Sequence, residues 1–361
     1  MRILHTESSK GWGGQENRTM NELVTMRDRG HELAVVGRPG ARILDRAKEA
    51  GFATFTVDMR GAIDLPAIIK LRRVIREFGA DVVNTHSGRD TQLAGMAART
   101  LSQRPRIVRT RHLALPITSK FTYSILPDQV VTVSRFVERY LVSAGVPQAK
   151  VCTIATGVDF GRYQPSTAGG TLKAELGLSP DTLLIGTVAI LRAKKGHAEI
   201  LDAAPAVLAR FPEAHFVFAG DGPQTENLKA RIAAEGLNGR VHLLGLRRDV
   251  TNVLESLDLF VLPTHQEALG TAFIEAAALG VPAIGTNIDG VPEIVQDGST
   301  GLLVPPHDGK ALGEAIISLL ADPERRAAMS RTASEFVRRQ FSREKMAEGM
   351  EALYQRLLDA R

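Results

Sequence analysis

The chain has 361 residues, of which 44% are hydrophobic and 24% charged, as expected for a globular protein large enough for two domains. Its single cysteine, Cys152, excludes an internal disulfide framework and a cysteine-rich metal site. No apolar run approaches the roughly 18 residues that would span a bilayer, and the N-terminus shows no signal peptide, so a cytoplasmic location is expected.

The net charge of +5 is unevenly distributed along the chain. Residues 1–165 contain 25 Lys and Arg against 15 Asp and Glu, whereas the remainder contains 20 basic and 25 acidic residues. Such asymmetry bears on binding partners rather than on fold. The basic half could approach anionic lipid headgroups, a phosphorylated glycolipid or nucleic acid, or its arginine-rich helices could simply be solvated.

In the first half, short β-branched runs alternate with amphipathic segments, which predicts a parallel α/β sheet. The expected strands are residues 2–5, 32–37, 53–57, 82–85, 106–109 and 129–133, and the clearest helices are residues 16–29 and 65–78.

A glycine-rich loop, Ser9 to Glu16, follows the first predicted strand and opens a helix. Glycines such as Gly13 and Gly14 let the backbone approach a ligand, and a helix N-terminus favours an anion. The loop is neither a dinucleotide GxGxxG nor a P-loop, so a tight structural turn is the alternative interpretation.

Polar clusters follow two further predicted strands. The first is Asn84 to Asp90, which includes His86, and the second is Arg109 to His112. Ligands bind at the carboxyl ends of strands in open α/β sheets, although a single histidine in such a place is more often structural.

The segment 164–171 is the best linker, and the α/β rhythm restarts after it. Strands are expected at residues 183–189, 215–219, 241–244, 259–262 and 281–285, with helices between them, which predicts a second doubly wound sheet. Residues 311–320, 324–339 and 344–358 are expected to be helices.

The most informative stretch runs from Leu259 to Pro306 and forms a predicted βαβ unit. Gly270 and Thr271 open its helix, whose first backbone N–H groups would attract a phosphate. Glu267 precedes the helix and Glu275 lies inside it, and eight helical positions span roughly 12 Å. Two solvated glutamates are the alternative.

This Glu-x7-Glu motif, Glu267-Ala-Leu-Gly-Thr-Ala-Phe-Ile-Glu275, with the GVP and GVPEIV turns that follow it, resembles the donor-binding signature of the retaining glycosyltransferases of family 4 (group 1). The resemblance implies the GT-B fold, an α/β architecture of two doubly wound Rossmann-like domains facing each other across a cleft. The domains would be residues 1–165 for the acceptor and 172–343 for the nucleotide-sugar, with a C-terminal helix, 344–361, crossing back to the first.

The resemblance also assigns site residues. The catalytic residues would be Glu267, Lys195, Arg192 and His112. The donor-binding residues would be Gly13, Gly14, Gly220, Leu246, Arg247, Ala268, Leu269, Gly270, Thr271 and Glu275. Residues on the acceptor side would be Glu16, His86 and Asp90. The family arginine of the VGRLxxxKG pattern falls at Ile190 here, so Arg192 is expected to supply the charge instead.

The function implied is retaining transfer of a sugar from a nucleotide-diphosphate sugar, UDP-sugar being favoured, with the departing phosphate accepting the acceptor's proton. The chain has no Asp-x-Asp motif, which favours metal-independent transfer without a cofactor. The GWGGQE and NTHSGRD segments resemble those of lipopolysaccharide and cell-surface polysaccharide transferases, so the acceptor would be a phosphorylated glycolipid or polysaccharide. The enzyme would then lie peripherally on the anionic inner face of the cytoplasmic membrane and would not bind nucleic acid. A nucleotide-sugar-binding protein without turnover, or another GT-B enzyme such as an epimerase, is the alternative.

Overall fold

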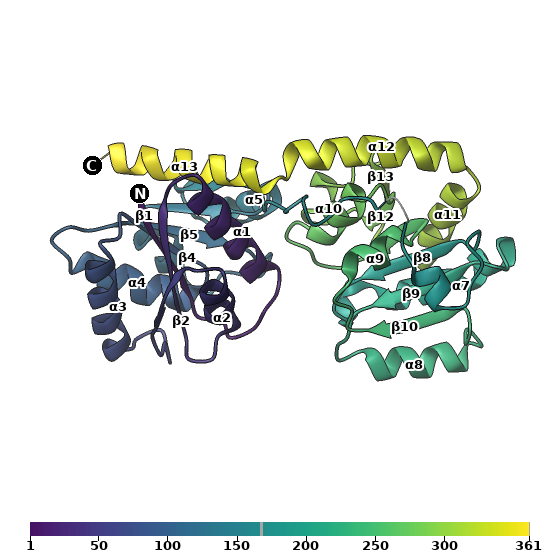
Figure 1. Cartoon of the computed structure of the whole chain (residues 1–361), viewed down its shortest axis with the longest axis horizontal. Helices are drawn as coiled ribbons and strands as arrows, with labels where there is room; N and C mark the ends of the chain where they lie inside the picture. The colour runs from purple at the N-terminus through teal and green to yellow at the C-terminus, as the bar shows by residue number, and fades with distance from the viewer. Residues whose placement is uncertain (167–168, 361) are drawn as a thin grey trace. The chain divides into compact units, whose positions relative to one another are not determined.

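In the computed structural model, which describes residues 1–166 and 169–360, the chain divides into two compact units (Figure 1). Unit 1 comprises Met1–Val158 and Phe341–Arg361, and unit 2 comprises Asp159–Gln340. The divisions therefore fall at Val158 and Gln340, where the sequence analysis placed them at residues 165 and 343. Residues 167 and 168 of the expected linker lie outside the described residues.

Unit 1 contains a seven-stranded sheet in which all neighbouring strands are parallel. Its strands are β1 (Arg2–Glu7), β2 (Glu32–Gly37), β3 (Ala53–Thr56), β4 (Val82–Thr85), β5 (Arg106–Arg111), β6 (Gln129–Thr132) and β7 (Val151–Thr153). The strand order is β3-β2-β1-β4-β5-β6-β7, so β2 and β3 lie on one side of β1 and β4 to β7 lie on the other. This is the doubly wound arrangement that the sequence predicted.

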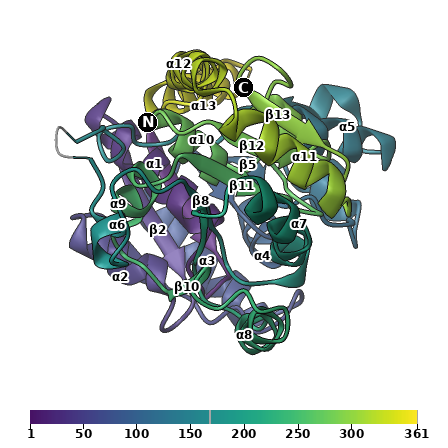
Figure 2. The same cartoon turned by 90° about the vertical axis from the view of Figure 1, so that its right-hand side faces the viewer.

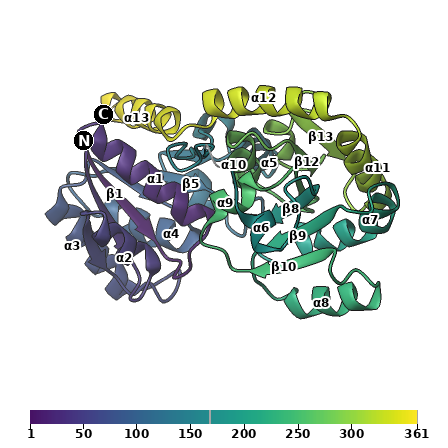
Figure 3. The ribbon, with the colours of Figure 1, turned by 45° about the vertical axis from the view of Figure 1, so that its right-hand side comes forward.

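Helices cover both faces of this sheet. They are α1 (Gly14–Asp28), α2 (Arg42–Glu49), α3 (Leu65–Phe78), α4 (Gly88–Arg99), α5 (Arg135–Ser143) and α13 (Arg343–Asp359). Because successive strand side chains point to opposite faces, Ile3 joins a core containing α1 and α13 residues, and Leu4 joins a core containing α3 and α4 residues. The last helix, α13, lies beside α1 (Figures 1 and 3).

Local sequence signals fix the ends of these helices. The Asp64 side chain accepts a hydrogen bond from the Ala67 N–H at the start of α3, and Gly79, with φ of 66°, ends it in the left-handed conformation. Ser87 and Asp90 form a reciprocal capping box at the start of α4. The carboxylate of Asp90 is therefore tied to the backbone at the carboxyl end of β4.

Unit 2 contains a six-stranded parallel sheet in the order β10-β9-β8-β11-β12-β13. Its strands are β8 (Leu184–Val188), β9 (His215–Ala219), β10 (Val241–Gly245), β11 (Leu259–Leu262), β12 (Ala283–Thr286) and β13 (Gly301–Val304). Strands β9 and β10 lie on one side of β8, and strands β11 to β13 lie on the other side, so the strand order reverses between β8 and β11. Ligands bind at such a switch point in doubly wound sheets.

The helices of unit 2 are α6 (Leu172–Glu175), α7 (His197–Arg210), α8 (Thr225–Ala234), α9 (Val250–Glu255), α10 (Thr271–Ala278), α11 (Gly309–Leu320) and α12 (Pro323–Gln340). Helices α7 and α11 lie side by side over one face of the sheet (Figure 2). Helix α8 lies beside the edge strand β10 (Figure 3). Helix α10 packs on the sheet through an edge-to-face contact of Phe273 with Phe260 at 5.4 Å.

The described residues also form four short helical segments: a π-helix at Phe121–Ile125 and 3-10 helices at Gln148–Lys150, Ala193–Lys195 and Val291–Glu293. Among the residues described, none of the helices combines the length and the apolar character needed to cross a membrane.

Candidate active site

The loop after β8 carries Lys195 to the centre of the unit 2 sheet's carboxyl edge. The 3-10 turn Ala193–Lys195 ends at Gly196, which has φ of 75° and begins α7. A Cβ at Gly196 would lie 2.0 Å from the carbonyl oxygen of Pro263, so only glycine permits the two loops to pack this closely. The Lys194 carbonyl accepts hydrogen bonds from the His265 N–H (2.7 Å) and the Thr264 hydroxyl (3.0 Å). The loops after β8 and β11 are thus joined backbone to backbone.

These hydrogen bonds between the two loops bring Lys195 close to Glu267, 72 positions later in the chain. Lys195 Nζ lies 2.5 Å from Glu267 Oε2, and each side chain retains just under a fifth of its exposure. An ion pair so placed is screened less than a surface pair, yet both groups can still reach a ligand. The structure therefore brings together the cation and the carboxylate that the sequence analysis singled out.

The loop after β12 holds Glu267 from the other side. The Glu267 N–H donates to the Asp289 carboxylate (3.0 Å), and its carbonyl accepts from the Gly290 N–H (3.1 Å). A Cβ at Gly290 would lie 2.2 Å from the carbonyl oxygen of Ala268, so glycine is required here too. Burial raises the pKa of Asp289, and the charge of Glu267 adds to the increase. The backbone of Glu267 is thus held by hydrogen bonds to the loop after β12, in addition to the contact of its side chain with Lys195.

The N-terminus of α10 follows directly. Gly270 occupies the N-cap position with φ of 98° and offers no side-chain cap. Its positive φ and a Cβ position 2.8 Å from the Phe273 ring both require glycine. Without a capping side chain, the first N–H groups of the helix, from Thr271 onward, are suited to an anion. The buried Leu269 and half-buried Ala268 link this helix end to Glu267.

Glu275 lies one turn into α10 and is half-buried. Burial raises its pKa from 4.5 to about 7, opposed by a hydrogen bond from Tyr163 and by the charge of Arg162. The sequence analysis missed Tyr163, because its position close to Glu275 depends on how residues after Val158 enter unit 2. A carboxyl that titrates near neutrality can both donate and accept hydrogen bonds.

Replacing Glu275 with glutamine is expected to alter the pH dependence of stability. Because the folded pKa lies above the unfolded value, the folded state binds more protons, and wild-type stability should fall as the pH rises from about 4.5 to 7. The Glu275→Gln variant should lose most of this dependence and gain on the order of 1–3 kcal/mol over wild type at pH 8. Urea unfolding at pH 5 and pH 8 measures this, with the exposed Glu314→Gln as control. Parallel pH profiles for wild type and Glu275→Gln would contradict it.

The other residues predicted for the site in unit 2, the catalytic candidate Arg192 and the donor-binding candidates Gly220, Leu246 and Arg247, occupy three loops on this edge. Gly220, after β9, has φ of 149°, and a Cβ there would lie 1.9 Å from the Ala189 carbonyl at the end of β8. Arg192 is exposed in the loop after β8. Leu246 is exposed after β10, while the Arg247 guanidinium already binds Glu175 (2.9 Å) and Asp249 (2.6 Å). These two carboxylates raise the pKa of Arg247 and hold it between α6 and α9.

In unit 1, the predicted histidines belong to a buried chain of three. His5 Nδ1 lies 3.0 Å from His86 Nε2, and His86 Nδ1 lies 3.0 Å from His112 Nε2. Burial lowers the pKa of all three, and for His86 and His112 well below the ordinary value, so these imidazoles are neutral at pH 7. At the inner end, His5 Nε2 lies 3.7 Å from the Glu22 carboxylate. The sequence analysis missed His5, since only the strand order β1-β4-β5 aligns it with His86 and His112. It also missed Glu22, which is buried on α1.

The other unit 1 candidates surround the end of β1. Gly13 is the N-cap of α1 and Gly14 is its first residue. Glu16 is buried beside Gly13. Asp90 accepts hydrogen bonds from the His86 N–H (2.8 Å) and the Thr6 hydroxyl (3.0 Å).

Glu7, which the sequence analysis did not select, ends β1 near this group. Its carboxylate accepts from the Ser9 N–H (2.7 Å) and from the Gln15 amide. Burial, together with the neighbouring Asp90, raises its pKa to about 8. Glu7 is therefore, after Glu275 of unit 2, a second carboxyl group whose pKa is raised to near neutral pH.

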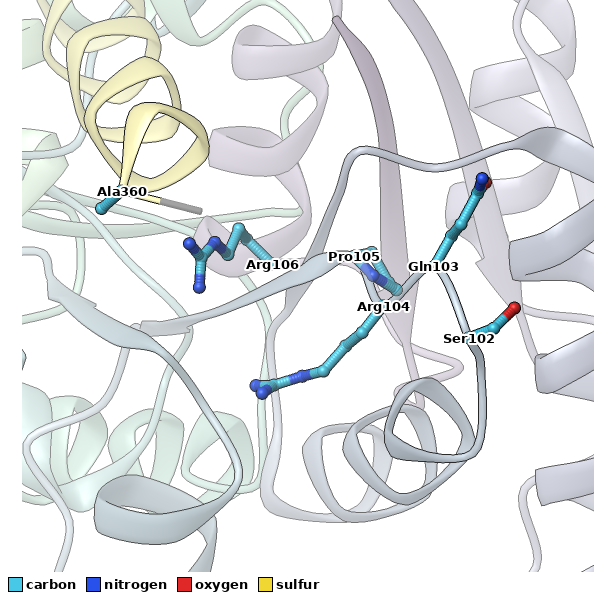
Figure 4. A pocket seen from close by; sticks show the side chains of 6 residues that line it. All are labelled: Ser102, Gln103, Arg104, Pro105, Arg106 and Ala360. Atoms are coloured by element: carbon cyan, nitrogen blue, oxygen red, sulfur yellow. The ribbon is translucent and has the colours of Figure 1, made fainter.

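A separate pocket of about 620 Å³ lies at the amino end of β5, away from the carboxyl ends of the strands that carry the predicted residues (Figure 4). Its lining residues are Ser102, Gln103, Arg104, Pro105, Arg106 and Ala360. Arg106 begins β5, whereas His112 follows the end of the same strand, and Arg104 is bound by Asp128 at 2.8 Å. None of the predicted site residues lines this pocket.

Two doubly wound sheets, each with polar and ionisable groups at its carboxyl edge, are the architecture of the GT-B class. A family model described as glycosyl transferases group 1 matches residues 170–336, and one described as glycosyltransferase family 4 matches residues 12–162. A GDP-mannose-dependent alpha-(1-6)-phosphatidylinositol monomannoside mannosyltransferase of Mycolicibacterium smegmatis is 30% identical over 334 residues, covering 86% of this chain and 85% of the relative. The chain therefore belongs to the group 1 glycosyltransferases of family 4 and is an enzyme of that kind.

Two further similarities agree with this assignment. An Escherichia coli UDP-Gal:alpha-D-GlcNAc-diphosphoundecaprenol alpha-1,3-galactosyltransferase is 25% identical over 343 residues, covering 89% of this chain and 88% of the relative. The crystal structure of Anabaena Alr3699/HepE in complex with UDP and glucose has a TM-score of 0.86 at 20% identity, covering 98% of this chain and 99% of that one. The structural similarity confirms the GT-B fold.

Proposed function

We propose that this glycosyltransferase moves a sugar from a nucleotide-diphosphate sugar to a hydroxyl group of a glycolipid or polysaccharide, with retention of anomeric configuration. The observation that carries the proposal is the Lys195–Glu267 pair, held beside the uncapped N-terminus of α10 at the switch point of the unit 2 sheet. A cation and helix amides suit a diphosphate, and carboxylates suit sugar hydroxyls.

The chemistry follows from these groups. The bond from the anomeric carbon to the diphosphate breaks, and the acceptor oxygen forms a new bond on the same face. The acceptor's proton passes to the departing phosphate, so no protein base is needed. Negative charge grows on the leaving group, where Lys195, Arg192 and the α10 amides stabilise it. Glu267 orients the sugar and Glu275 the ribose. With this positive charge supplied by the protein and no Asp-x-Asp motif, no metal ion contacts the diphosphate in the proposed reaction.

UDP-sugar is the proposed donor. The structurally similar Anabaena protein was crystallised with UDP and glucose, and the Escherichia coli relative is named for UDP-Gal. The Mycolicibacterium relative is GDP-mannose-dependent, so the base is the point to test first.

A thermal-shift comparison of UDP-, GDP- and ADP-sugars on the full chain tests the donor. A ligand that binds only the folded state stabilises it by about 2.7 kcal/mol at 100 times its Kd. A UDP-sugar should therefore raise Tm by several degrees, the others by much less, and slow release of UDP should accompany binding. A larger shift with GDP-sugar would overturn the choice of base, and no shift with any of the three would count against the site.

For the acceptor, we propose a phosphorylated glycolipid or polysaccharide at an anionic membrane surface. The names of the two relatives specify a diphosphoundecaprenol-linked sugar and a phosphatidylinositol mannoside, both phosphate-bearing lipids. The excess of ten positive charges in residues 1–165 suits such partners. Association with anionic vesicles should weaken with salt; association that high salt leaves unchanged would contradict the electrostatic part of the proposal.

A further inference from the structure

Three side chains near the candidate site, one from a helix and two from loops of unit 2, converge on one point. Glu199 lies in the first turn of α7, His265 in the loop after β11 and His307 in the loop after β13. His265 Nε2 lies 2.7 Å and His307 Nδ1 lies 3.5 Å from the same oxygen, Glu199 Oε1. One nitrogen or oxygen from each residue lies within 4.8 Å of the other two.

A hydrogen bond between His265 and Glu199 accounts for only part of this cluster. Glu199 is buried, and its second oxygen, Oε2, is also buried without a hydrogen-bond partner in the described part of the chain. A buried carboxylate oxygen left unpaired is costly. His307 has φ of 58°, a conformation that histidine seldom adopts, and its ring centroid lies 3.8 Å from that of His265. The pair alone explains neither the unpaired oxygen nor the position of His307.

A divalent cation bound by all three side chains would give the buried Glu199 carboxylate a charged partner and would hold His307 beside His265. Two imidazoles and one carboxylate are a common three-ligand set for Zn²⁺, with a fourth position open to water. Ca²⁺ and Mg²⁺ prefer oxygen ligands, so two imidazoles disfavour them. Ligand atoms about 2.0–2.2 Å from a tetrahedral ion lie about 3.3–3.6 Å apart. The His307–Glu199 separation of 3.5 Å matches this range, and the His265–Glu199 separation of 2.7 Å would lengthen on binding the ion.

We propose that Glu199, His265 and His307 form a Zn²⁺ site that braces the loops of the candidate active site. Glu199 is four residues after Lys195, and His265 is two residues before Glu267. An ion bound by both would fix the loops that carry the Lys195–Glu267 pair, with His307 adding the loop after β13. The ion makes no bond to donor or acceptor in this proposal, and the site stands apart from the proposed choice of substrate.

The test measures metal binding directly, without reference to activity. The full chain is stripped with chelator and titrated with Zn²⁺ by calorimetry, and with Co²⁺ to read the absorption bands of the bound ion. We expect one high-affinity equivalent and a rise in Tm with added Zn²⁺. His307→Ala, which removes a side chain that is 66% exposed, should weaken binding by about 100-fold or more without unfolding the protein.

Two further variants make the result decisive. Glu199→Gln should also weaken Zn²⁺ binding. The matched control is His242→Ala, which removes a histidine paired with His215 (2.9 Å) elsewhere in unit 2 and should leave the affinity unchanged. The proposal is overturned if the wild type binds no Zn²⁺ at micromolar concentration, or if His307→Ala binds as tightly as wild type. Loss of binding in His242→Ala alone would also overturn it.

Discussion

Replacing Lys195 with alanine is expected to lower kcat for sugar transfer by about 10²–10³-fold, equivalent to about 2.7–4 kcal/mol. The ammonium group lies 2.5 Å from Glu267, beside the N-terminus of α10, where the leaving diphosphate would accumulate charge. Its removal takes away a fixed positive charge in a partly buried site, where electrostatic stabilisation is stronger than in water.

Steady-state release of the nucleotide diphosphate, with and without acceptor, measures this effect. Lys229→Ala is the matched control, because it removes a lysine that pairs with a glutamate (2.9 Å) on the exposed face of α8 in the same unit. The control should keep wild-type activity. A wild-type kcat in Lys195→Ala would remove this lysine from the proposed mechanism.

Replacing Glu267 with glutamine is expected to lower kcat/KM by about 10²-fold or more. Glutamine keeps the shape and the backbone contacts to Asp289 and Gly290, but it removes the charge that pairs with Lys195. In the proposed mechanism the same charge accepts hydrogen bonds from the sugar. Hydrogen bonds to ionised acceptors are roughly twice as strong as neutral ones. The loss should therefore appear without a large change in Tm.

A double-mutant cycle shows whether the two residues act together. Because the two side chains are 2.5 Å apart, the effects of the two substitutions should be non-additive. The fold-loss of kcat/KM in the double variant, Lys195→Ala with Glu267→Gln, should be clearly smaller than the product of the two single fold-losses. Transfer, release of the nucleotide diphosphate and Tm are recorded for all four proteins. Full multiplicativity would show that the ion pair has no joint role, even if each residue alone matters.

The histidine chain in unit 1 shows how strand order creates a feature that no single segment contains. His86 and His112 each follow a predicted strand, and each was interpreted alone. In the structure β4 lies between β1 and β5, so His5, His86 and His112 stand in one row across three neighbouring strands. Sequence reasoning could have found the row only by first deriving the order of the strands.

Other elements were missed although a local signal existed. Helix α4 begins at Gly88 with a Ser87-x-x-Asp90 capping box, inside a segment interpreted only as a polar cluster. The four-residue strand β13, in contrast, offered no such signal, because its apolar residues are too few to show a period. Short elements are stabilised mainly by their neighbours, so their own residues indicate them weakly.

The amino-acid sequence by itself determined the alternation of strands and helices, the two parallel sheets, and the glycines and helix starts at the carboxyl ends of the strands, because these depend on local periodicity and backbone sterics. It also indicated the family through the motif from Glu267 to Glu275. Only the tertiary structure decided which loops meet. The contact of Lys195 with Glu267, the hydrogen bond of Tyr163 to Glu275, and the cluster of Glu199 with His265 and His307 join residues far apart in the chain. Such contacts depend on which strands are neighbours and on glycines that let two backbones pack closely, and neither follows from residue spacing.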